Sequence, residues 1–150
     1  MTVHMTIDSK RFNKRMGKIM SNMENRRSLY AQAVVIADKW IQDNFKLEGA
    51  LAQEGGWKPL KAATLARRRK GKGKGSPKIL QDTGQLKSRW KHQWTARFGK
   101  IQSGVIYGTT HHEGYKPLKI PARPILPTEE QLMPKLIKLA ELWVNGAFRK

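Results

Sequence analysis

Apolar residues recur at helical spacing at both ends of the chain. In the N-terminal segment, residues 1–48, they repeat every three or four positions after Asp8 or Ser9, either of which can cap a helix. One gap interrupts this stripe near Arg26 and Arg27. The stripe comprises Phe12, Met16, Ile19, Met23, Tyr30, Val34, Ala37, Ile41 and Phe45. We therefore predict one long N-terminal helix, whose methionines we interpret as core residues.

A second stripe of this kind predicts a C-terminal helix within residues 128–150. Thr128 and Gln131 have the spacing of a capping box. Because a proline is best tolerated in a first turn, Pro134 predicts that the regular part begins near Met133. The apolar stripe comprises Leu132, Leu136, Leu139, Ala140, Trp143 and Phe148.

Alternation with period two replaces the helical spacing in the middle of the chain. Apolar and polar residues alternate over residues 94–98 and again over residues 101–107. Gly99-Lys100 lies between the two runs and suits a two-residue hairpin turn. The predicted fold class is α+β in a single domain, residues 1–150. Loops and an antiparallel sheet form the middle part, residues 49–127, and the two terminal helices pack beside the sheet.

Shorter elements precede the predicted hairpin. We expect a short helix over Ala62 to Arg69, and another one, ending near Arg89, that Asp82 or Thr83 caps. Between them lies "RRRKGKGKGSPK", residues 67–78, where alternating glycine and dense positive charge predict a mobile basic loop. It is not a phosphate-binding P-loop, because the required GxxxxGK[ST] order is missing. The basic residues in question are Arg67, Arg68, Arg69, Lys70, Lys72 and Lys74.

Charge is the strongest feature of the composition. Thirty Lys and Arg against eleven Asp and Glu give a formal net charge of +19 over 150 residues. Such a charge favours a polyanionic partner, either nucleic acid or acidic proteins of an assembly. Cysteine is absent, which excludes disulfides, thiolate metal sites and cysteine nucleophiles. Without a membrane-spanning run or a signal-like N-terminus, we expect a soluble cytoplasmic protein.

Two histidines and a glutamate, His111, His112 and Glu113, raise the question of a metal or catalytic site. In an extended segment His111 and Glu113 share one face and His112 points away. Zinc needs three or four convergent ligands, and this spacing matches neither HExxH nor paired CxxC, even if the hairpin brings His92 nearby. We favour a structural histidine, His111, that bonds a carbonyl or carboxylate, and expect no metal and no cofactor.

The tripeptide Asp82-Thr83-Gly84 also occurs in aspartic proteases. Those enzymes need two facing aspartates that share a proton, within apolar strands. This chain has one copy, which a helix start follows, so the tripeptide does not indicate a protease. Together with the histidine pattern, this predicts that the protein is not an enzyme.

Four short motifs occur in order along the chain: "WKPLxxxTLxR" (Trp57 to Arg67), "ILxDTGxL" (Ile79 to Leu86), "YGxxHxxG" (Tyr107 to Gly114) and "IPARPxL" (Ile120 to Leu126). Together they resemble the phage virion morphogenesis proteins, also called the tail completion or tail S-like family. The resemblance covers roughly residues 46–142. The family usually has alanine after the tyrosine of the third motif, glutamine after its histidine and an aromatic residue before its glycine; this chain has Gly108, His112 and Glu113.

This resemblance implies a structural protein of the head–tail neck in the virion, assembled in the host cytoplasm. Such proteins form rings, often of six subunits, that contact neighbouring neck, connector and tail proteins, and packaged DNA passes through them. In the segment Pro121-Ala122-Arg123-Pro124, the two prolines stiffen the backbone, and Arg123 offers a planar fork for a carboxylate. We expect Arg123 to anchor the sheet or a subunit contact, or to form an internal ion pair. The predicted assembly or structural motif comprises Trp57, Leu60, Asp82, Thr83, Gly84, Tyr107, His111, Gly114, Pro121, Arg123 and Pro124.

Two other functions remain open at this level. The first is a nucleic-acid-binding protein that contacts phosphates through Arg67 to Lys74 and Lys10 to Lys18, with no sequence-specific recognition. The second is a metal-dependent hydrolase that uses His111 and Glu113.

Overall fold

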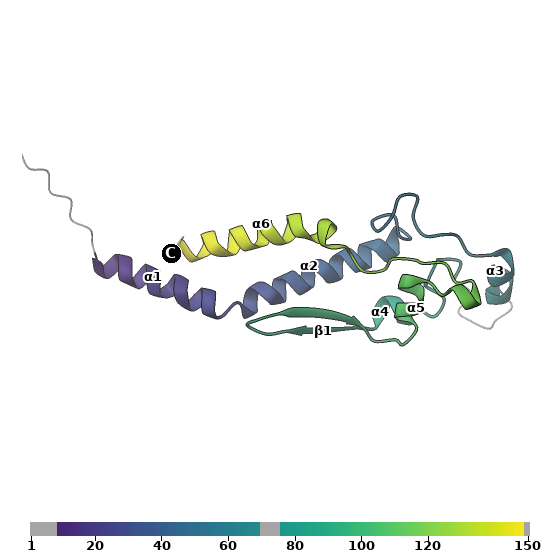
Figure 1. The fold of residues 1–150 in the computed structure, drawn as a ribbon, viewed down its shortest axis with the longest axis horizontal. Helices are drawn as coiled ribbons and strands as arrows, with labels where there is room; N and C mark the ends of the chain where they lie inside the picture. Colours follow the sequence, from purple (N-terminus) through teal and green to yellow (C-terminus); the bar gives the residue numbers. More distant parts are fainter. Residues whose placement is uncertain (1–8, 70–75, 149–150) are drawn as a thin grey trace, which may run out of the picture.

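The computed structural model describes residues 9–69 and 76–148, without the side chains of residues 9, 11, 12, 15, 22, 69 and 145–148. The molecule is elongated, with the first helix at one end and the third helix at the other (Figure 1). None of the described helices is both long and apolar enough to cross a membrane. In order, the elements are α1 (Ser9–Glu24), α2 (Arg27–Lys46), α3 (Ala62–Arg69), α4 (Gln85–Ser88), β1 (Trp90–Trp94), β2 (Gly99–Ser103), α5 (Gly108–Glu113), a 3-10 helix η1 (Lys116–Leu118) and α6 (Glu129–Phe148).

The predicted N-terminal helix is two helices, and the break lies at the gap in the apolar stripe. Helix α1 ends at Glu24 and α2 begins at Arg27. At the junction, the Asn25 Oδ1 accepts a hydrogen bond from the Arg27 N–H at 3.4 Å. Asparagine side chains compete in this way with the helical ladder, and the exposed Arg26 offers no packing to resist the break.

Helix α6 begins earlier than predicted. It starts at Glu129 and contains Pro134, so the expected start near Met133 is wrong. Proline has no N–H to donate to the carbonyl four residues earlier, which is that of Glu130. Pro134 and Glu130 are both exposed, so water can donate a hydrogen bond to that carbonyl instead. The capping-box contact of Gln131 is confirmed, because its Oε1 accepts the Thr128 N–H at 3.0 Å.

The hairpin is present, but its turn lies elsewhere. Strands β1 and β2 are antiparallel and pair Trp90 with Ser103 and Trp94 with Gly99. The turn is therefore Thr95–Phe98, not the predicted Gly99-Lys100. The Thr95 Oγ1 accepts the N–H groups of Arg97 and Phe98 at 3.1 and 3.2 Å, which closes the turn. Gly99 serves packing instead, since a Cβ there would lie 2.9 Å from the Val34 Cγ2 on α2.

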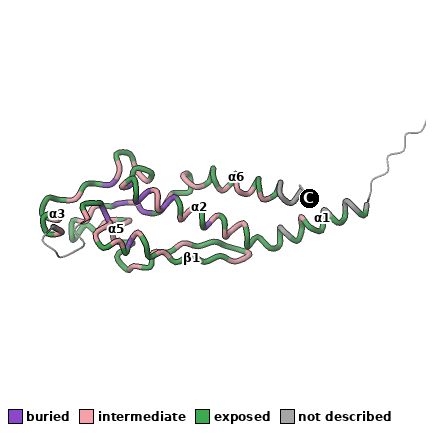
Figure 2. Tube along the Cα trace, turned by 180° about the vertical axis from the view of Figure 1, so that it is seen from behind, coloured by how far each residue is buried: buried purple, intermediate pink, exposed green. Residues whose placement is uncertain are grey.

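Helix α2 lies between the hairpin and α6 (Figure 1). The buried residues gather where α2 ends, against the irregular segments after it (Figure 2). We call residues 40–69 and 76–127 the body, and α1 with residues 136–148 of α6 the arm. The core of the body consists of Trp40, Ile41, Phe45, Trp57, Ile79, Leu80, Leu86 and Ile125.

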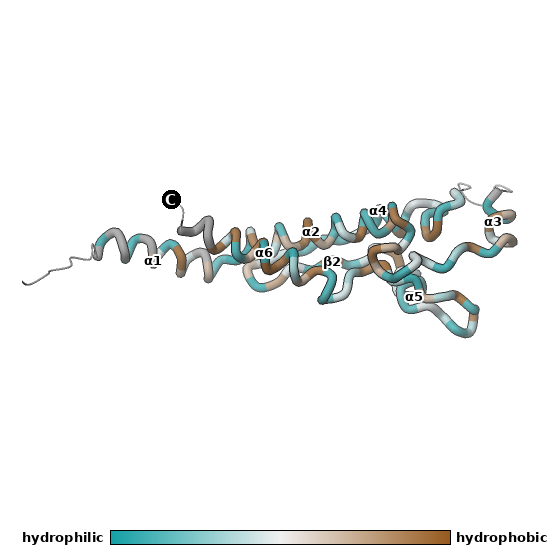
Figure 3. The backbone as a smooth tube through the Cα atoms, turned by 90° about the horizontal axis from the view of Figure 1, so that it is seen from above, coloured by the Kyte–Doolittle hydropathy of each residue, from teal (hydrophilic) through white to brown (hydrophobic). Residues whose placement is uncertain are grey.

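The arm has no such core among the residues that the structure describes. Apolar positions continue along α6 (Figure 3), but many of their side chains are exposed. Met16, Met20 and Met23 on α1 are exposed too, so their interpretation as core residues is wrong. Helix α1 extends past the hairpin, and α6 is the element that lies beside it. The exposed apolar side chains of the arm are Met16, Met20, Met23, Ile137, Leu142 and Val144.

Candidate binding cleft

Arg123 is buried, with 6% of its surface exposed, and holds the backbone of the loop that contains Trp57. Its Nε and Nη2 both donate to the Lys58 carbonyl oxygen, at 3.2 and 3.0 Å. Its own N–H donates to the His111 carbonyl oxygen at 2.8 Å. The predicted internal ion pair is wrong for the described residues, because the partner is a main-chain carbonyl. Arg123 anchors the loop rather than the sheet.

The neighbouring Pro124 is the second anchor. Its carbonyl oxygen accepts hydrogen bonds from the Trp57 Nε1 at 2.8 Å and the Asn44 Nδ2 at 3.2 Å. The Trp57 ring packs edge-on against Phe45, with centroids 5.3 Å apart. Asn44 is fully buried and was not singled out from the sequence. Its position three residues after Ile41, within the apolar stripe, is the signal that marks it.

The two histidines lie on helix α5, so the extended arrangement considered for them does not occur. The helix ends at Glu113, and the next residue, Gly114, has a φ of +80°. A Cβ at Gly114 would lie 2.7 Å from the Ala122 N. This close approach and positive φ explain the glycine. Contrary to the prediction, the His111 ring does not bond a carbonyl or carboxylate of the described residues; its neighbour His112 bonds the chain in another way, because its Nδ1 accepts the Ile125 N–H at 2.9 Å.

His111 instead faces the cleft described below. Its ring packs edge-on against Tyr107, with centroids 5.9 Å apart, and its Nδ1 is buried without a hydrogen-bond partner. Burial, and then the charge of Arg123, lower the pKa of His111 below its usual value. His92 lies elsewhere, with its Nε2 3.2 Å from the Asp38 Oδ1. Within residues 9–69 and 76–148, no three His, Asp or Glu side chains are grouped to hold a metal ion.

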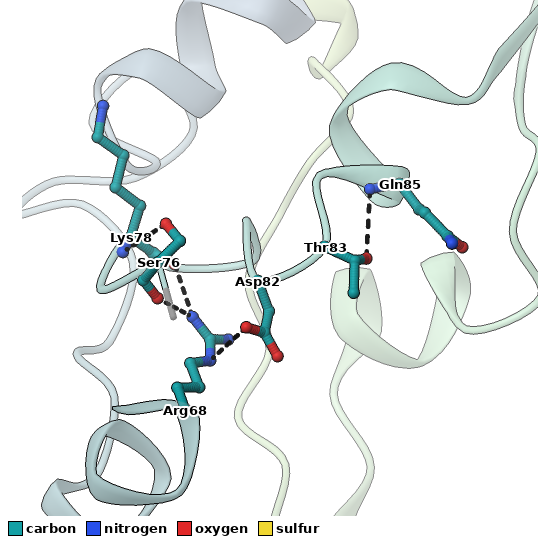
Figure 4. A network of polar contacts seen from close by, with 6 residues as sticks. All are labelled: Arg68, Ser76, Lys78, Asp82, Thr83 and Gln85. Atoms are coloured by element: carbon teal, nitrogen blue, oxygen red, sulfur yellow. Dashed lines mark hydrogen bonds and ion pairs between the residues drawn. The ribbon is translucent and has the colours of Figure 1, made fainter. Parts of the chain in front are cut away.

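Asp82 and Thr83 lead into α4 (Figure 4). Gly84 is the N-cap residue and makes no side-chain cap, so the predicted capping by Asp82 or Thr83 is wrong; the Thr83 Oγ1 accepts only the Gln85 N–H, at 3.4 Å. Asp82 instead faces Arg68 of α3, with 3.6 Å between the Oδ1 and Nε atoms. That distance is an ion-pair contact, too long for a hydrogen bond.

The Arg68 guanidinium group forms hydrogen bonds and an ion pair within the molecule. Its Nη1 donates to the carbonyl oxygens of Ser76 and Lys78, at 2.8 and 3.0 Å (Figure 4). Of the basic residues predicted near DNA, Arg67 is exposed. The side chain of Arg69, together with Lys70, Lys72 and Lys74 of the predicted mobile loop, lies outside the described residues.

These segments surround a cleft of about 980 Å³. Seven of the predicted motif residues line it: Leu60, Asp82, Thr83, Tyr107, His111, Pro121 and Arg123. Trp57, Gly84, Gly114 and Pro124 do not line the cleft. Its cationic residues are Lys58, Lys61, Arg67, Arg68, Lys116, Lys119 and Arg123.

Comparison with known proteins identifies the relatives of this chain. A sequence model of the phage virion morphogenesis family matches residues 7–141. The chain belongs to that family. The match also covers α1, which the four motifs did not reach. No curated protein and no solved structure gives a significant match. The family role is structural, in the morphogenesis of the phage virion, so the protein is associated with the virion.

Proposed function

We propose that this protein is a non-enzymatic subunit of the phage head–tail neck. It assembles as a ring, for which the family resemblance suggests six subunits, and completes or joins the tail in the host cytoplasm. Family membership supports the virion role. The proposal of assembly rests on the exposed apolar side chains of the arm.

The arm exposes apolar side chains on two adjacent helices. Met16, Met20 and Met23 follow the spacing of one face of α1, and Met20 and Met23 are 59% and 61% exposed. Leu142 on α6 is 62% exposed. Exposed apolar surface of this kind marks protein contacts, and a neighbouring subunit in a ring would bury it.

Nonspecific contact with DNA is the second candidate function, and the net charge of +19 supports it. Packaged DNA that passes through a ring would meet this charge. Strongly salt-dependent DNA binding by the isolated monomer would favour a nucleic-acid-binding protein. Ring formation with weak DNA affinity favours the neck subunit.

The test is an early stop codon in this gene within its phage genome, followed by electron microscopy of the lysate. We expect DNA-filled heads apart from tails, or tails with abnormal upper ends. Complete, infectious particles would overturn the proposal. A plasmid copy of the gene should restore particles, and so should the control Lys14→Ser/Lys18→Ser, which changes exposed polar positions of α1. Met20→Ser/Met23→Ser should fail to restore them.

A further inference from the structure

The cleft has a strong excess of positive charge. Among its described lining residues, seven carry cationic side chains and one, Asp82, a carboxylate. That carboxylate already faces Arg68. Arg68 and Arg123 both line the cleft, and burial, and then the charge of Arg68, lower the pKa of Arg123. An anionic occupant would relieve this repulsion.

The same cleft also presents apolar side chains. Leu60, Leu118 and Ile120 line it beside Tyr107, and Leu118 is 70% exposed. A nucleic-acid backbone would pair with the cations but would leave these leucines unburied. The volume of about 980 Å³ is large enough for several side chains. Cations around apolar residues therefore match a peptide with both carboxylates and apolar side chains.

One wall of the cleft is held in place by backbone hydrogen bonds. Tyr115 and Ile120 exchange N–H to carbonyl bonds of 2.9 and 3.0 Å, and the Lys119 N–H bonds the Lys116 carbonyl oxygen at 2.9 Å. These bonds close a short loop that carries Lys116, Leu118 and Lys119 along the cleft. Because this wall is ordered before binding, less conformational entropy is lost when the partner binds.

We propose that this cleft binds an acidic peptide segment, with apolar residues among its carboxylates, from another protein of the virion. That the partner is a virion protein rests on the proposed function. That the cleft suits an acidic and partly apolar peptide rests only on the residues that line it. Its carboxylates pair with exposed cations such as Lys61 and Lys116, and its apolar side chains pack on Leu118. The interaction is the contact through which a ring subunit would recognise a differently folded neighbour.

The test uses the full chain and a fluorescent twelve-residue peptide that alternates glutamate with leucine, measured by fluorescence anisotropy. Lys61→Glu/Lys116→Glu should weaken binding by about 10-fold, because two favourable pairs become repulsive. Lys91→Glu/Lys100→Glu makes the same change of charge at exposed positions of the hairpin and should weaken binding by less than about 3-fold. Leu118→Ser should weaken binding about 5-fold, whereas Ile106→Ser, at a fully exposed position outside the cleft, should not.

Three results would overturn the inference. The first is equal weakening by the cleft and hairpin variants, which would show an effect of net charge alone. The second is a short DNA duplex that competes for the cleft as well as the peptide does. The third is a ring of this chain alone that falls apart in the Lys61→Glu/Lys116→Glu variant, which would assign the cleft to a second copy. If the peptide does not bind but the stop-codon phage gives separated heads and tails, this inference is rejected and the proposed function is retained. If the peptide binds but the stop-codon phage gives complete particles, this inference is retained and the proposed function is rejected.

Discussion

The body and the arm of this protein are stabilised in different ways. The body buries large aromatic and aliphatic side chains around Phe45, and polar side chains satisfy the backbone of its irregular segments. Gln81 donates to the Phe45 carbonyl oxygen at 2.8 Å, and the Glu48 Oε1 accepts the Ile79 N–H at 2.7 Å. The arm consists of helices, which satisfy their own backbone but leave apolar side chains exposed.

The difference indicates a division of roles. A segment with few regular hydrogen bonds must be tied down by tertiary contacts, so the body folds around its own core. A helix needs no such ties to form its backbone bonds, so its apolar face can stay exposed. The body therefore contains the core, and the arm contains the surface that we propose for assembly.

The largest expected effect is the loss of the Phe45 ring. Phe45→Ala should lower the free energy of unfolding by about 3–5 kcal/mol, because it leaves a cavity against Trp57. Met20→Ala in the arm should lower it by less than about 0.5 kcal/mol. Urea unfolding followed by circular dichroism measures both. Equal effects would contradict the separation of body and arm.

Gly49 gives the next largest effect. An alanine Cβ at this position, where φ is +92°, would lie 2.3 Å from the Trp57 Cδ1. Gly49→Ala should therefore destabilise the body by about 2–4 kcal/mol. Gly55→Ala is the matched control, since φ is +75° there but no atom lies within 4 Å, and it should cost about 1 kcal/mol. A control as destabilising as Gly49→Ala would show that backbone strain, and not Trp57, causes the loss.

A smaller effect is expected from pH. Burial, with Arg123 as the lesser cause, holds the pKa of His111 below its usual 6.5. The unfolded chain then binds this proton more readily, so the contribution to stability is complete above about pH 6.5 and is lost as the pH falls. Between about pH 7.5 and 5.5, the free energy of unfolding should fall less in His111→Gln than in the natural protein, as measured by urea unfolding at both pH values. An unchanged loss would contradict this role for His111.

The smallest change in stability is expected where the effect on assembly is greatest. Met20→Ser/Met23→Ser should change the free energy of unfolding by less than about 0.5 kcal/mol, because both side chains are exposed. The variant should nevertheless remain a monomer in sedimentation experiments under conditions in which the natural protein assembles. A large loss of stability would show that these methionines pack within the subunit.

Local patterns were enough to predict helical segments at both ends of the chain and α3, but not α5. The bounds of α3, Ala62–Arg69, and the bond from the Thr128 N–H to Gln131 follow from neighbouring residues. The gap in the apolar stripe marked where α1 and α2 separate, although it was not interpreted as a break. Of the residues in the cleft, seven, among them Arg123 and His111, belong to the motif predicted from the sequence, but the sequence did not give their contacts.

Tertiary contacts decided the rest. The sequence alone determined that this is an α+β chain with amphipathic helices at both ends and a stiff Pro-Ala-Arg-Pro segment, because periodicity and proline act over a few residues. Only the folded structure decided that Arg123 holds the Lys58 carbonyl, 65 positions away, and that His112 rather than His111 bonds the chain. It also placed the hairpin turn at Thr95–Phe98 and the Gly99 backbone against α2, where a Cβ would lie 2.9 Å from the Val34 Cγ2. Contacts between distant segments depend on packing geometry, which no local pattern of residues contains.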